Sequence, residues 1–510
     1  MSTPEAVIEI GSTGVRLLIA ESTADGKRTV LDRAEMPLSL GHDVFTTGII
    51  SRETQSSCVH ILQRFKEQLA GWGILPSQTI VIATAAFRES KNKDPVMDKI
   101  LTATGFRVSV IDGIEENRLM YLAVTSRLAE ESAKVRAEDT VILEVGGGST
   151  EMMLMKKGKM AGAHSLRLGT VRLEPQIRAN AGSSDNIQRF IEDFIKNTKG
   201  SLESELDLSN VKQFIAVGSD ASLAAINVGK PISTWLWSID KQAFDDFVAE
   251  IQEYTPEERA ARFKISYNDA QTMHISLLIY KMFIHLTKVR TIIVPETNIR
   301  DGVIISRTEL PNLELKKEFF QQITASAMNL LRKYHGDERH ADFVRQVSLM
   351  LYDCLQKELS LEDERSRMLL EVAAILHDVG IFIRLDDHNL HSEYIIHNSE
   401  IFGLDQRDNK IVSQIARYHR GKSIPQDSEQ FQVLARIDRM IILKLTAILR
   451  IADAMDRGHG QTLQDISFQL KKDSLNIYTK GIKNLALERV ALNEKGDLFE
   501  SVFGYKIVLL

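Results

Sequence analysis

A short glycine-containing motif that occurs twice is the feature that most restricts the fold of this chain. Residues Glu9–Thr13 read EIGST, and residues Glu144–Thr150 read EVGGGST. Each copy lies between two apolar runs of the kind that form β-strands. A strand, a glycine turn and a second strand, present twice, indicate two duplicated domains that face each other across a cleft. Each domain would then present its turn to the same ligand.

The length of the chain agrees with several domains. A chain of 510 residues is several times longer than a typical domain, and 44% hydrophobic with 26% charged residues is ordinary for a folded protein. No apolar stretch is long enough to span a membrane, and the first residues lack a signal-peptide pattern, so we expect a cytoplasmic protein without membrane contacts. Cys58 and Cys354 have no disulfide or metal-knuckle spacing, and the net charge of −6 argues against a nucleic-acid partner.

Secondary-structure patterns divide the chain into parts. Strand-like and helix-like segments alternate to about residue 310, which predicts an α/β fold, long helices follow, and alternation returns in the last part. The predicted domains are 1–128, 129–310, 311–458 and 459–510. Predicted strands are Val7–Ile10, Leu17–Glu21, Thr79–Thr84, Val108–Ile111, Ile466–Leu470 and Leu475–Tyr478, and predicted helices are Arg52–Leu69 and Glu115–Leu128.

The repeated turns are suited to phosphate. Glycine lets backbone N–H groups converge on an anion without a Cβ in the way, and Ser or Thr hydroxyls add donors. A single turn of this type is more often only a tight turn, whereas two facing turns would hold successive phosphates. Glu9 and Glu144 end the strand before each turn, a position suited to Mg²⁺ beside a phosphate.

Five segments resemble the exopolyphosphatase/guanosine pentaphosphate phosphohydrolase (Ppx/GppA) family. They are Ile10–Leu18, Ala83–Ser90, Gly113–Leu119, Val145–Glu151 and Leu168–Leu173, in the order of the family. Weaker matches further along extend the resemblance over nearly the whole chain. The resemblance implies two duplicated actin-like (ribonuclease H-like, ASKHA) domains that form a cleft, followed by an all-α domain and a small α+β tail.

The resemblance also implies roles for residues of the cleft. Glu116 matches the glutamate that orients and deprotonates the attacking water, and Arg88 matches an arginine that contacts phosphate. Glu151 matches a second acidic residue that assists the metal or the water. Mg²⁺ or Mn²⁺ would be held by Glu9, Glu144 and Glu151. The expected phosphate cradle consists of Gly11, Ser12, Thr13, Gly146, Gly147, Gly148, Ser149, Thr150, Gly218 and Ser219.

Some positions depart from the family pattern. Glu9 and Glu144 stand where the family has Asp, which moves each carboxylate by roughly 1.5 Å and leaves the metal preference open. The turn Val217–Asp220 carries an acid in place of a glycine-rich sequence, which makes nucleoside binding there less secure. Arg16 has two interpretations, a family-like basic residue or an outward ion-pair partner.

The helical part carries a second candidate site. His340, the pair His377–Asp378 and Asp453 follow the ligand order of the HD metal-dependent phosphohydrolase superfamily, so this domain resembles an HD domain. Such ligands from separate helices would hold one divalent metal that activates water. Related helical extensions often lack these ligands and serve dimer contacts and substrate passage, so metal binding stays open. Other histidines expected nearby are His388, His391 and His419.

A basic segment accompanies this region. From Gln406 to Arg450, nine Lys or Arg residues stand against four acidic ones. Such a segment would retain a polyanion such as polyphosphate. A helix surface that is basic by chance is an equal alternative.

These observations together predict an exopolyphosphatase that releases terminal orthophosphate from inorganic polyphosphate. Hydrolysis of guanosine pentaphosphate in the same cleft is the alternative. A noncatalytic sensor of polyphosphate or of guanosine penta- and tetraphosphate, and a hydrolase acting through the helical domain, also stay open. The resemblance implies a homodimer.

Overall fold

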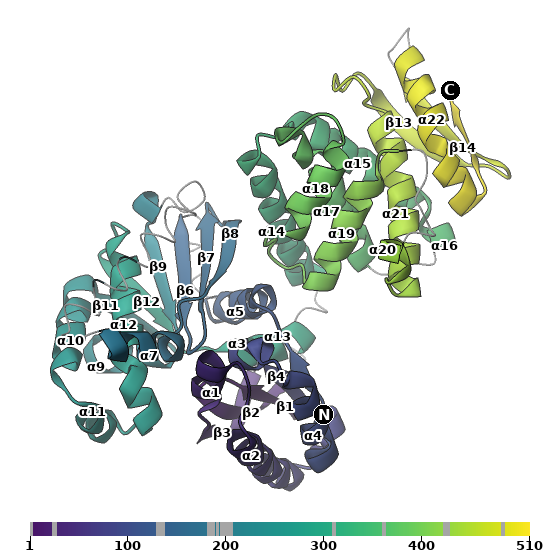
Figure 1. Cartoon of the computed structure of the whole chain (residues 1–510). Coiled ribbons are helices and arrows are strands. Elements are labelled where there is room, and N and C mark those ends of the chain that lie inside the picture. The colour runs from purple at the N-terminus through teal and green to yellow at the C-terminus, as the bar shows by residue number, and fades with distance from the viewer. Residues whose placement is uncertain are drawn as a thin grey trace. The chain divides into compact units, whose positions relative to one another are not determined.

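The computed structural model divides into two compact units, Met1–Phe319 and Phe320–Leu510 (Figure 1). The division falls inside helix α14 (Leu313–Lys333), close to the boundary expected at residue 311. The structure describes residues 4–22, 28–128, 138–180, 189, 193, 208–308, 313–359, 364–421, 429–480 and 485–510.

The first lobe of unit 1 is built on a five-stranded sheet in the order β3-β2-β1-β4-β5. Its strands are β1 (Glu5–Ile10), β2 (Gly14–Ser22), β3 (Arg28–Pro37), β4 (Ile80–Ala83) and β5 (Val108–Val110). The first three strands are antiparallel, whereas β4 and β5 run parallel to β1 and β4 respectively. These bounds confirm the strands predicted in this part of the chain.

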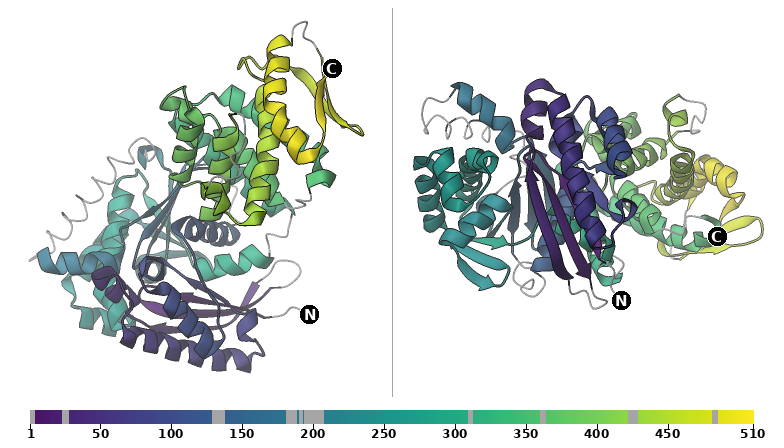
Figure 2. Two further views of the ribbon diagram at one scale, coloured as in Figure 1. Left: turned by 45° about the vertical axis from the view of Figure 1, so that its right-hand side comes forward. Right: turned by 90° about the horizontal axis from the view of Figure 1, so that it is seen from below.

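Helices pack on this sheet because their apolar positions recur at helical spacing. They are α1 (Leu40–Thr47), α2 (Arg52–Gly71), α3 (Ala85–Glu89) and α4 (Lys93–Thr104). Helix α5 (Gly113–Arg127) instead packs against Thr150–Lys156 and Lys159–Leu166, two strands of the second sheet of unit 1. The predicted helix over residues 52–69 is confirmed as α2, which buries Leu62 and Phe65 and runs along the sheet (Figure 2). Ser51 begins α2 by accepting a hydrogen bond from the Thr54 N–H, which satisfies one of the unpaired donors of the first turn.

The second lobe repeats the first and enlarges it. Its seven-stranded sheet has the order β10-β11-β12-β9-β6-β7-β8, in which β8-β7-β6-β9-β12 reproduces the strand order of the first lobe. The predicted duplication is therefore present in the topology. The strands are β6 (Thr140–Val145), β7 (Thr150–Lys156), β8 (Lys159–Leu166), β9 (Gln213–Val217), β10 (Lys230–Ser233), β11 (Leu236–Asp240) and β12 (Thr291–Pro295). The helices are α7 (Thr170–Asn180), α9 (Ser219–Val228), α10 (Lys241–Glu253), α11 (Pro256–Phe263) and α12 (Tyr267–His285).

Helix α13 (Ile299–Thr308) follows the second lobe in the chain but packs on the first. It contacts α5 and β1. The approach to α5 is close at Gly302, where a Cβ would lie 2.0 Å from the carbonyl oxygen of Leu119. The predicted domain 129–310 thus contains a helix that belongs spatially to the first lobe.

Unit 2 is a helical bundle with a small sheet. Apart from the C-terminal part of α14, its helices are α15 (Glu338–Cys354), α16 (Gln356–Leu359), α17 (Glu364–Leu376), the 3₁₀ turn η3 (Val379–Phe382), α18 (His388–His397), α19 (Gln406–Tyr418), α20 (Glu429–Gln432) and α21 (Arg436–Ala454). The tail forms β13 (Gln464–Leu470), β14 (Ser474–Lys480), α22 (Ala486–Phe503) and β15 (Lys506–Leu509). The two strands predicted in the tail are confirmed as β13 and β14, and α22 packs against α21.

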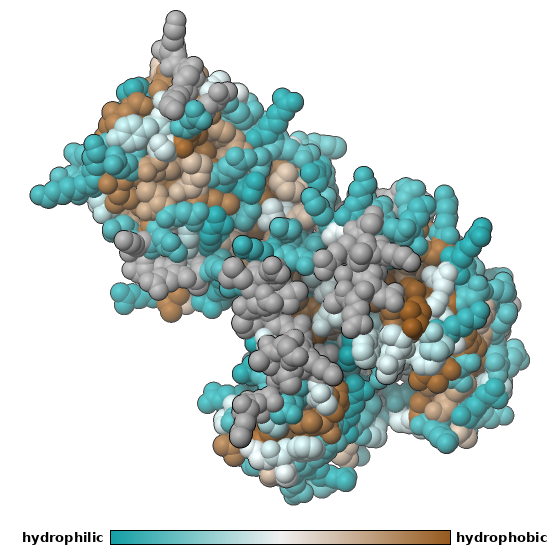
Figure 3. Space-filling model, turned by 180° about the vertical axis from the view of Figure 1, so that it is seen from behind, coloured by the Kyte–Doolittle hydropathy of each residue, from teal (hydrophilic) through white to brown (hydrophobic). Residues whose placement is uncertain are grey.

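On the face seen in Figure 3, polar residues surround smaller apolar areas. Within the described ranges, no helix has the length and apolar character needed to cross a membrane.

Candidate active site

A cavity of about 250 Å³ in unit 1 is lined by both glycine turns. The turn between β1 and β2 and the turn between β6 and β7 contribute residues at its surface, as the repeat predicts. The predicted site residues that line it are Glu9, Gly11, Ser12, Thr13, Glu116, Glu144, Gly146, Gly147, Gly148, Ser149, Glu151, Gly218 and Ser219. Two predicted residues, Thr150 and Arg88, are not among the lining residues. The Thr150 hydroxyl is buried and donates to the carbonyl of Leu168, which takes it away from the cradle.

The two turns have the same construction and touch each other. The Gly11 N–H donates to the Gly14 carbonyl at 2.9 Å, and the Gly146 N–H donates to the Ser149 carbonyl at the same distance. A Cβ placed on Gly147 would lie 2.9 Å from the Cβ of Ser12. Glycine is therefore needed at this position so that the two lobes can approach.

Several N–H groups of these turns have no acceptor. Among the residues that the structure describes, the N–H groups of Ser12, Thr13, Gly147 and Gly148 donate to no carbonyl or side chain. All four residues line the cavity. Unpaired backbone donors in residues that line one cavity from two sides are suited to the oxygens of a phosphate chain.

Glu116 is placed by the start of α5. The Asp112 side chain caps this helix by accepting from the Glu115 N–H at 2.8 Å, which puts Glu116 in the first turn. Arg88 donates to Glu116 Oε1 at 2.5 Å and to the Ile111 carbonyl at 2.6 Å. Arg88 therefore orients Glu116, and no direct contact with the cavity is seen.

Burial sets the acidity of Glu116. Its side chain is 10% exposed, and loss of water raises its pKa to about 7, although the Arg88 guanidinium acts in the opposite direction. A carboxyl group with a pKa near neutrality can accept a proton from water and release it again. This matches the predicted role of Glu116 as a general base.

Glu151 lies on β7 directly after the second turn. It accepts hydrogen bonds from Ser149 Oγ at 2.7 Å, Ser165 Oγ at 2.9 Å and Asn117 Nδ2 at 3.2 Å. Burial and the nearby Glu116 raise its pKa well above the usual value. Glu151 is thus fixed at the cavity wall by β7, β8 and α5.

The two predicted metal ligands that precede the turns differ in their surroundings. Glu9 forms ion pairs with Arg300 and, at 3.8 Å, with Arg16. Among the described residues, Glu144 has no hydrogen-bond or ion-pair partner, and burial together with the charges of Glu9 and Glu116 raises its pKa to about 8.

The carboxylates of the cleft fit a hard divalent cation that is bound by few protein atoms. Carboxylate oxygens are suitable ligands for Mg²⁺ or Mn²⁺, and a cation near Glu144 would relieve the repulsion between the carboxylates. Within the described ranges, every group of three candidate ligand atoms lying within 4.8 Å of one another is in unit 2, so the cleft has no prearranged set of three. Mg²⁺ commonly uses only one or two carboxylates together with water and phosphate oxygens.

Three features in or beside the cavity were not assigned a role from sequence. Arg300, from α13, reaches Glu9 because α13 packs on the first lobe. The Tyr280 hydroxyl donates to the Val217 carbonyl and accepts from the Val145 N–H at 3.0 Å, which ties the ends of β6 and β9 together. Asp269 adds another acid to the lining. One of the weaker family-like matches, Asn298–Val303, contains Arg300.

The position of Arg16 resolves its two interpretations. It donates to Glu35 at 2.7 Å and to Thr13 Oγ1 at 3.1 Å, while it also lines the cavity. Arg16 is therefore both an ion-pair partner and a residue of the site wall.

The basic segment over residues 406–450 is largely engaged within unit 2. Arg407 pairs with Asp438 at 2.6 Å, Arg417 pairs with Glu393, and Arg450 is fully buried against the Tyr418 carbonyl. A buried Arg450 is not available to a polyanion. Lys422 and Asp427 of this segment lie outside the described residues.

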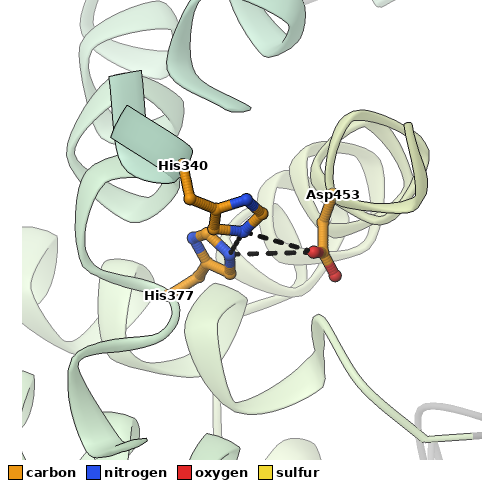
Figure 4. Close-up of side chains that lie close together, drawn as sticks. All are labelled: His340, His377 and Asp453. Carbon is orange, nitrogen blue, oxygen red and sulfur yellow. Dashed lines mark hydrogen bonds and ion pairs between the residues drawn. The ribbon is translucent and has the colours of Figure 1, made fainter. Parts of the chain in front are cut away.

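The predicted ligands in unit 2 come together. His340 on α15, His377 and Asp378 after α17, and Asp453 on α21 are close neighbours, as Figure 4 shows for three of them. His388 and His419 join the group through Asp378, whereas His391 does not. The HD-like character of the unit stays a prediction.

Comparison with known proteins shows similar sequences and folds. The sequence pattern of the Ppx/GppA phosphatase family matches residues 18–310, and that of Ppx/GppA phosphatase domain III matches residues 323–498. A relative from Pseudoalteromonas translucida, named guanosine-5'-triphosphate,3'-diphosphate pyrophosphatase, is 23% identical, over 99% of this chain and 98% of its own.

Two solved structures share the fold. A Ppx/GppA family member from Aquifex aeolicus is 22% identical with a TM-score of 0.50, covering 61% of this chain and 99% of its own. An exopolyphosphatase from Cytophaga hutchinsonii is 19% identical with a TM-score of 0.53, covering 60% of this chain and 98% of its own. At identities of 22% and 19%, these two similarities show a shared fold and nothing more.

Proposed function

This chain belongs to the Ppx/GppA phosphatase family, and from that premise we propose that its cleft releases terminal orthophosphate from inorganic polyphosphate. The family consists of phosphoanhydride hydrolases. The observation that carries the proposal is the position of Glu116, a buried carboxyl with a pKa of about 7, in a cavity walled by two glycine turns with unpaired N–H groups.

The residues of the cleft can perform each step of this hydrolysis. The N–H groups of Ser12, Thr13, Gly147 and Gly148 would bind oxygens of the last phosphates and align the terminal phosphorus. Glu116 would accept a proton from water as the water oxygen bonds to that phosphorus and the bridging P–O bond breaks. The products are orthophosphate and a chain shorter by one phosphate.

The carboxylates of the second lobe would hold the metal. Bound Mg²⁺ or Mn²⁺ would neutralise charge on the non-bridging phosphate oxygens. Glu144 is the ligand that fits best because it has no other partner among the described residues, and Glu151 stands opposite it on the neighbouring strand. Glu9, paired with two arginines, would act through water.

Guanosine pentaphosphate is the second candidate substrate. The name of the relative from Pseudoalteromonas translucida, which aligns over 99% of this chain, favours it. Against it stands Asp220, which lines the cavity in place of the glycine-rich turn with which family members approach a nucleotide or polyphosphate, so that nucleoside binding there is less secure. Both substrates present the same terminal phosphoanhydride to Glu116.

Phosphate release is the direct test. Glu116→Gln should lower kcat/KM by about 100-fold or more, because it removes the general base. Glu115→Gln is the matched control, since Glu115 lies in the same helical turn but pairs with Arg118 at 2.6 Å and does not line the cavity. Long polyphosphate, short polyphosphate and guanosine pentaphosphate would be compared, each with Mg²⁺ and with Mn²⁺.

The outcomes separate the functional alternatives. Full activity of the Glu116→Gln variant would contradict the proposal. Activity that survives Glu116→Gln but is lost in Asp378→Ala would assign hydrolysis to unit 2. Substrate binding without turnover in the wild type, measured by calorimetry, would identify a sensor.

A further inference from the structure

The start of helix α7 holds the carbonyl oxygens of the second glycine turn. Backbone N–H groups in the first turn of α7 donate to the carbonyls of Gly146 and Gly147 at 3.0 and 2.9 Å. The side chain of Arg172, on the same helical turn, donates through Nε to the Gly148 carbonyl at 2.9 Å. Three successive carbonyls of the glycine turn therefore accept hydrogen bonds from α7, and the third of them depends on a side chain.

The carbonyls of this turn fix the direction of its N–H groups. In a trans peptide, the C=O of one residue and the N–H of the next point in opposite directions. Carbonyls bound to α7 thus turn the N–H groups of Gly147, Gly148 and Ser149 away from this helix. All three residues line the cavity, and within the described ranges none of these N–H groups donates to a carbonyl or side chain. Arg172, through the Gly148 carbonyl, sets the direction of the Ser149 N–H.

The contact between α7 and the turn is close. A Cβ on Gly169, the residue directly before α7, would lie 2.2 Å from the carbonyl carbon of Gly148. A Cβ on Gly148 itself would lie 2.6 Å from the Ala85 Cβ and 2.8 Å from the ring of Phe45, both in the first lobe. Only glycine permits two such approaches. The backbone at Gly148 is thus held between α7 and the first lobe.

Arg172 also reaches the first lobe. Its Nη2 donates to Glu89 Oε1 at 2.6 Å, and its guanidinium carbon lies 4.2 Å from the centre of the Phe45 ring. Glu89 is the last residue of α3, and Phe45 belongs to α1, which α7 contacts (Figure 1). The Arg172 side chain is only 16% exposed. One enclosed side chain therefore joins the second glycine turn to two helices of the first lobe.

Helix α3, which Arg172 contacts, also carries the residue that orients the general base. Arg88 precedes Glu89 in α3 and donates to Glu116 Oε1 at 2.5 Å. Neighbouring residues of a helix point to different sides, so α3 contacts Glu116 through Arg88 and Arg172 through Glu89. The phosphate cradle of the second lobe and the base beside the first lobe are therefore connected by consecutive contacts through α3.

We propose that Arg172 is a positioning residue for hydrolysis in the cleft. It holds the second glycine turn so that its N–H groups meet the phosphate chain, and it sets this turn relative to α3 and thus to Glu116. Arg172 does not line the cavity, so it acts through Gly148 and Glu89. A displacement of about 1 Å between reacting groups can lower a rate by about 100-fold. The inference rests on the function proposed above, because it assigns Arg172 a part in the same reaction.

A second arginine shares Glu89 but not the glycine turn. Arg167 donates to Glu89 Oε2 at 2.8 Å, and its side chain is 73% exposed. Burial acts to raise the pKa of Glu89, but hydrogen bonds from Arg172 and Arg167 outweigh burial and lower this pKa below its usual value. An ion pair as exposed as that of Arg167 contributes little to stability. Arg167 is therefore the matched control: it has the same side chain and the same partner as Arg172, without the bond to the Gly148 carbonyl.

Steady-state kinetics of the full-length protein test the proposal. Arg172→Met keeps much of the aliphatic length but removes the donors to Gly148 and Glu89, so it should lower kcat for phosphate release by about 10- to 100-fold. KM should change by less than about threefold, because the first glycine turn still binds the phosphate chain. Arg167→Met should stay within about twofold of the wild type. Long polyphosphate and guanosine pentaphosphate would both be used, with Mg²⁺.

Glu89→Gln separates the two contacts of Arg172. It keeps the bond to the Gly148 carbonyl and weakens the link to α3, so kcat should fall by about 3- to 10-fold, less than in Arg172→Met. Arg172→Lys should recover only part of the loss, because an ammonium group lacks the planar fork that serves two acceptors at once. A kcat of Glu89→Gln equal to that of the wild type would overturn the link between the lobes.

Hydrogen exchange separates this inference from the proposed function, since it needs no turnover. In Arg172→Met, peptides that cover residues 145–151 should exchange faster than in the wild type, whereas in Arg167→Met they should exchange at the wild-type rate. If the wild type hydrolyses neither substrate but shows this difference, the proposed function is contradicted and the role of Arg172 at the turn is supported.

The remaining outcomes overturn the inference. Unchanged exchange and unchanged kcat in Arg172→Met would do so, as would equal losses of kcat in Arg172→Met and Arg167→Met. A loss confined to KM would show that Arg172 serves binding and not alignment. Circular dichroism identifies variants that fail to fold; if Arg172→Met is one of them, Arg172→Lys and Glu89→Gln decide by the same comparisons.

Discussion

The two repeated turns of unit 1 close with the same hydrogen bond but differ where they meet. Counted from that bond, Ser12 of the first turn corresponds to Gly147 of the second. A Cβ at Gly147 would come within 2.9 Å of the Ser12 Cβ, and one at Gly148 within 2.6 Å of the Ala85 Cβ. The second turn therefore has more glycines, and they stand where a Cβ would be too close to the first lobe.

The strands beside the turns differ in charge. Glu9 stands opposite Arg16 across β1 and β2, whereas Glu144 stands opposite Glu151 across β6 and β7. The first lobe neutralises its carboxylate, while the second places two carboxylates together. Burial raises the pKa values of both, with further contributions from Glu9 and Glu116 at Glu144 and from Glu116 at Glu151. The repeated segment thus carries a neutralised carboxylate in the first lobe. In the second lobe it carries two adjacent carboxylates, which are suited to hold a cation or a proton.

The largest expected difference between the lobes is catalytic. Glu151→Gln should reduce kcat/KM for phosphate release by about 100-fold or more, because it removes charge from the wall that faces Glu116. Glu9→Gln should reduce it by about 10-fold, since Arg300 and Arg16 already neutralise Glu9. Steady-state kinetics at saturating Mg²⁺ would measure both. Equal losses would show that the two carboxylates have equivalent roles.

The contact between the turns should appear in stability. Gly147→Ala should lower the free energy of unfolding of unit 1 by about 1–3 kcal/mol, because its methyl group meets Ser12 and Val171 at 2.9 and 3.2 Å. Adding Ser12→Gly should restore part of this loss in a double-mutant cycle measured by denaturant unfolding.

A matched glycine in the same turn provides the control. A Cβ at Gly146 would meet only the Ser149 carbonyl oxygen within 4 Å, at 3.1 Å, so Gly146→Ala should have the smaller effect. Additive effects of Ser12→Gly and Gly147→Ala would contradict a direct contact between the turns.

The lobes should also differ in acid stability. His274 on α12 accepts a hydrogen bond from Arg259 at 3.1 Å, and burial together with that guanidinium lowers its pKa to about 4. The unfolded chain binds this proton below about pH 6.5 and the folded lobe does not, so stability falls as the pH drops from 6.5 towards 4. The expected loss between pH 7 and pH 5 is about 2 kcal/mol.

Hydrogen exchange resolved by lobe would measure this effect. His274→Gln should flatten the pH dependence of the second lobe, and His60→Gln should not change the first, because His60 is exposed on α2. An identical pH dependence in wild type and His274→Gln would show that His274 is protonated in the folded state at pH 5.

Much of the local structure could be predicted because it depends on neighbouring residues. Short apolar runs around Val7 and Leu17 predict strands from the local sequence, and the order of the five family-like segments placed Glu116 and Glu151. The ligand order in unit 2 likewise located His340, His377, Asp378 and Asp453.

Partners that come from distant segments could not be predicted. Arg300 reaches Glu9 only because α13 crosses to the first lobe, and Arg88 contacts Glu116 rather than the cavity. Thr13 and Thr150 both follow a serine at the end of the repeated motif. The Thr150 hydroxyl nevertheless donates to the Leu168 carbonyl.

The sequence by itself determined the duplicated turns, the family and the residue types of both candidate sites, because these follow from short segments and their order. The tertiary structure decided which carboxylate is neutralised, which N–H groups are left unpaired, and which histidines lie beside each oxygen of Asp378. The reason is physical: charge, solvation and ligand geometry depend on distances of a few ångströms between segments that only the packed chain brings together.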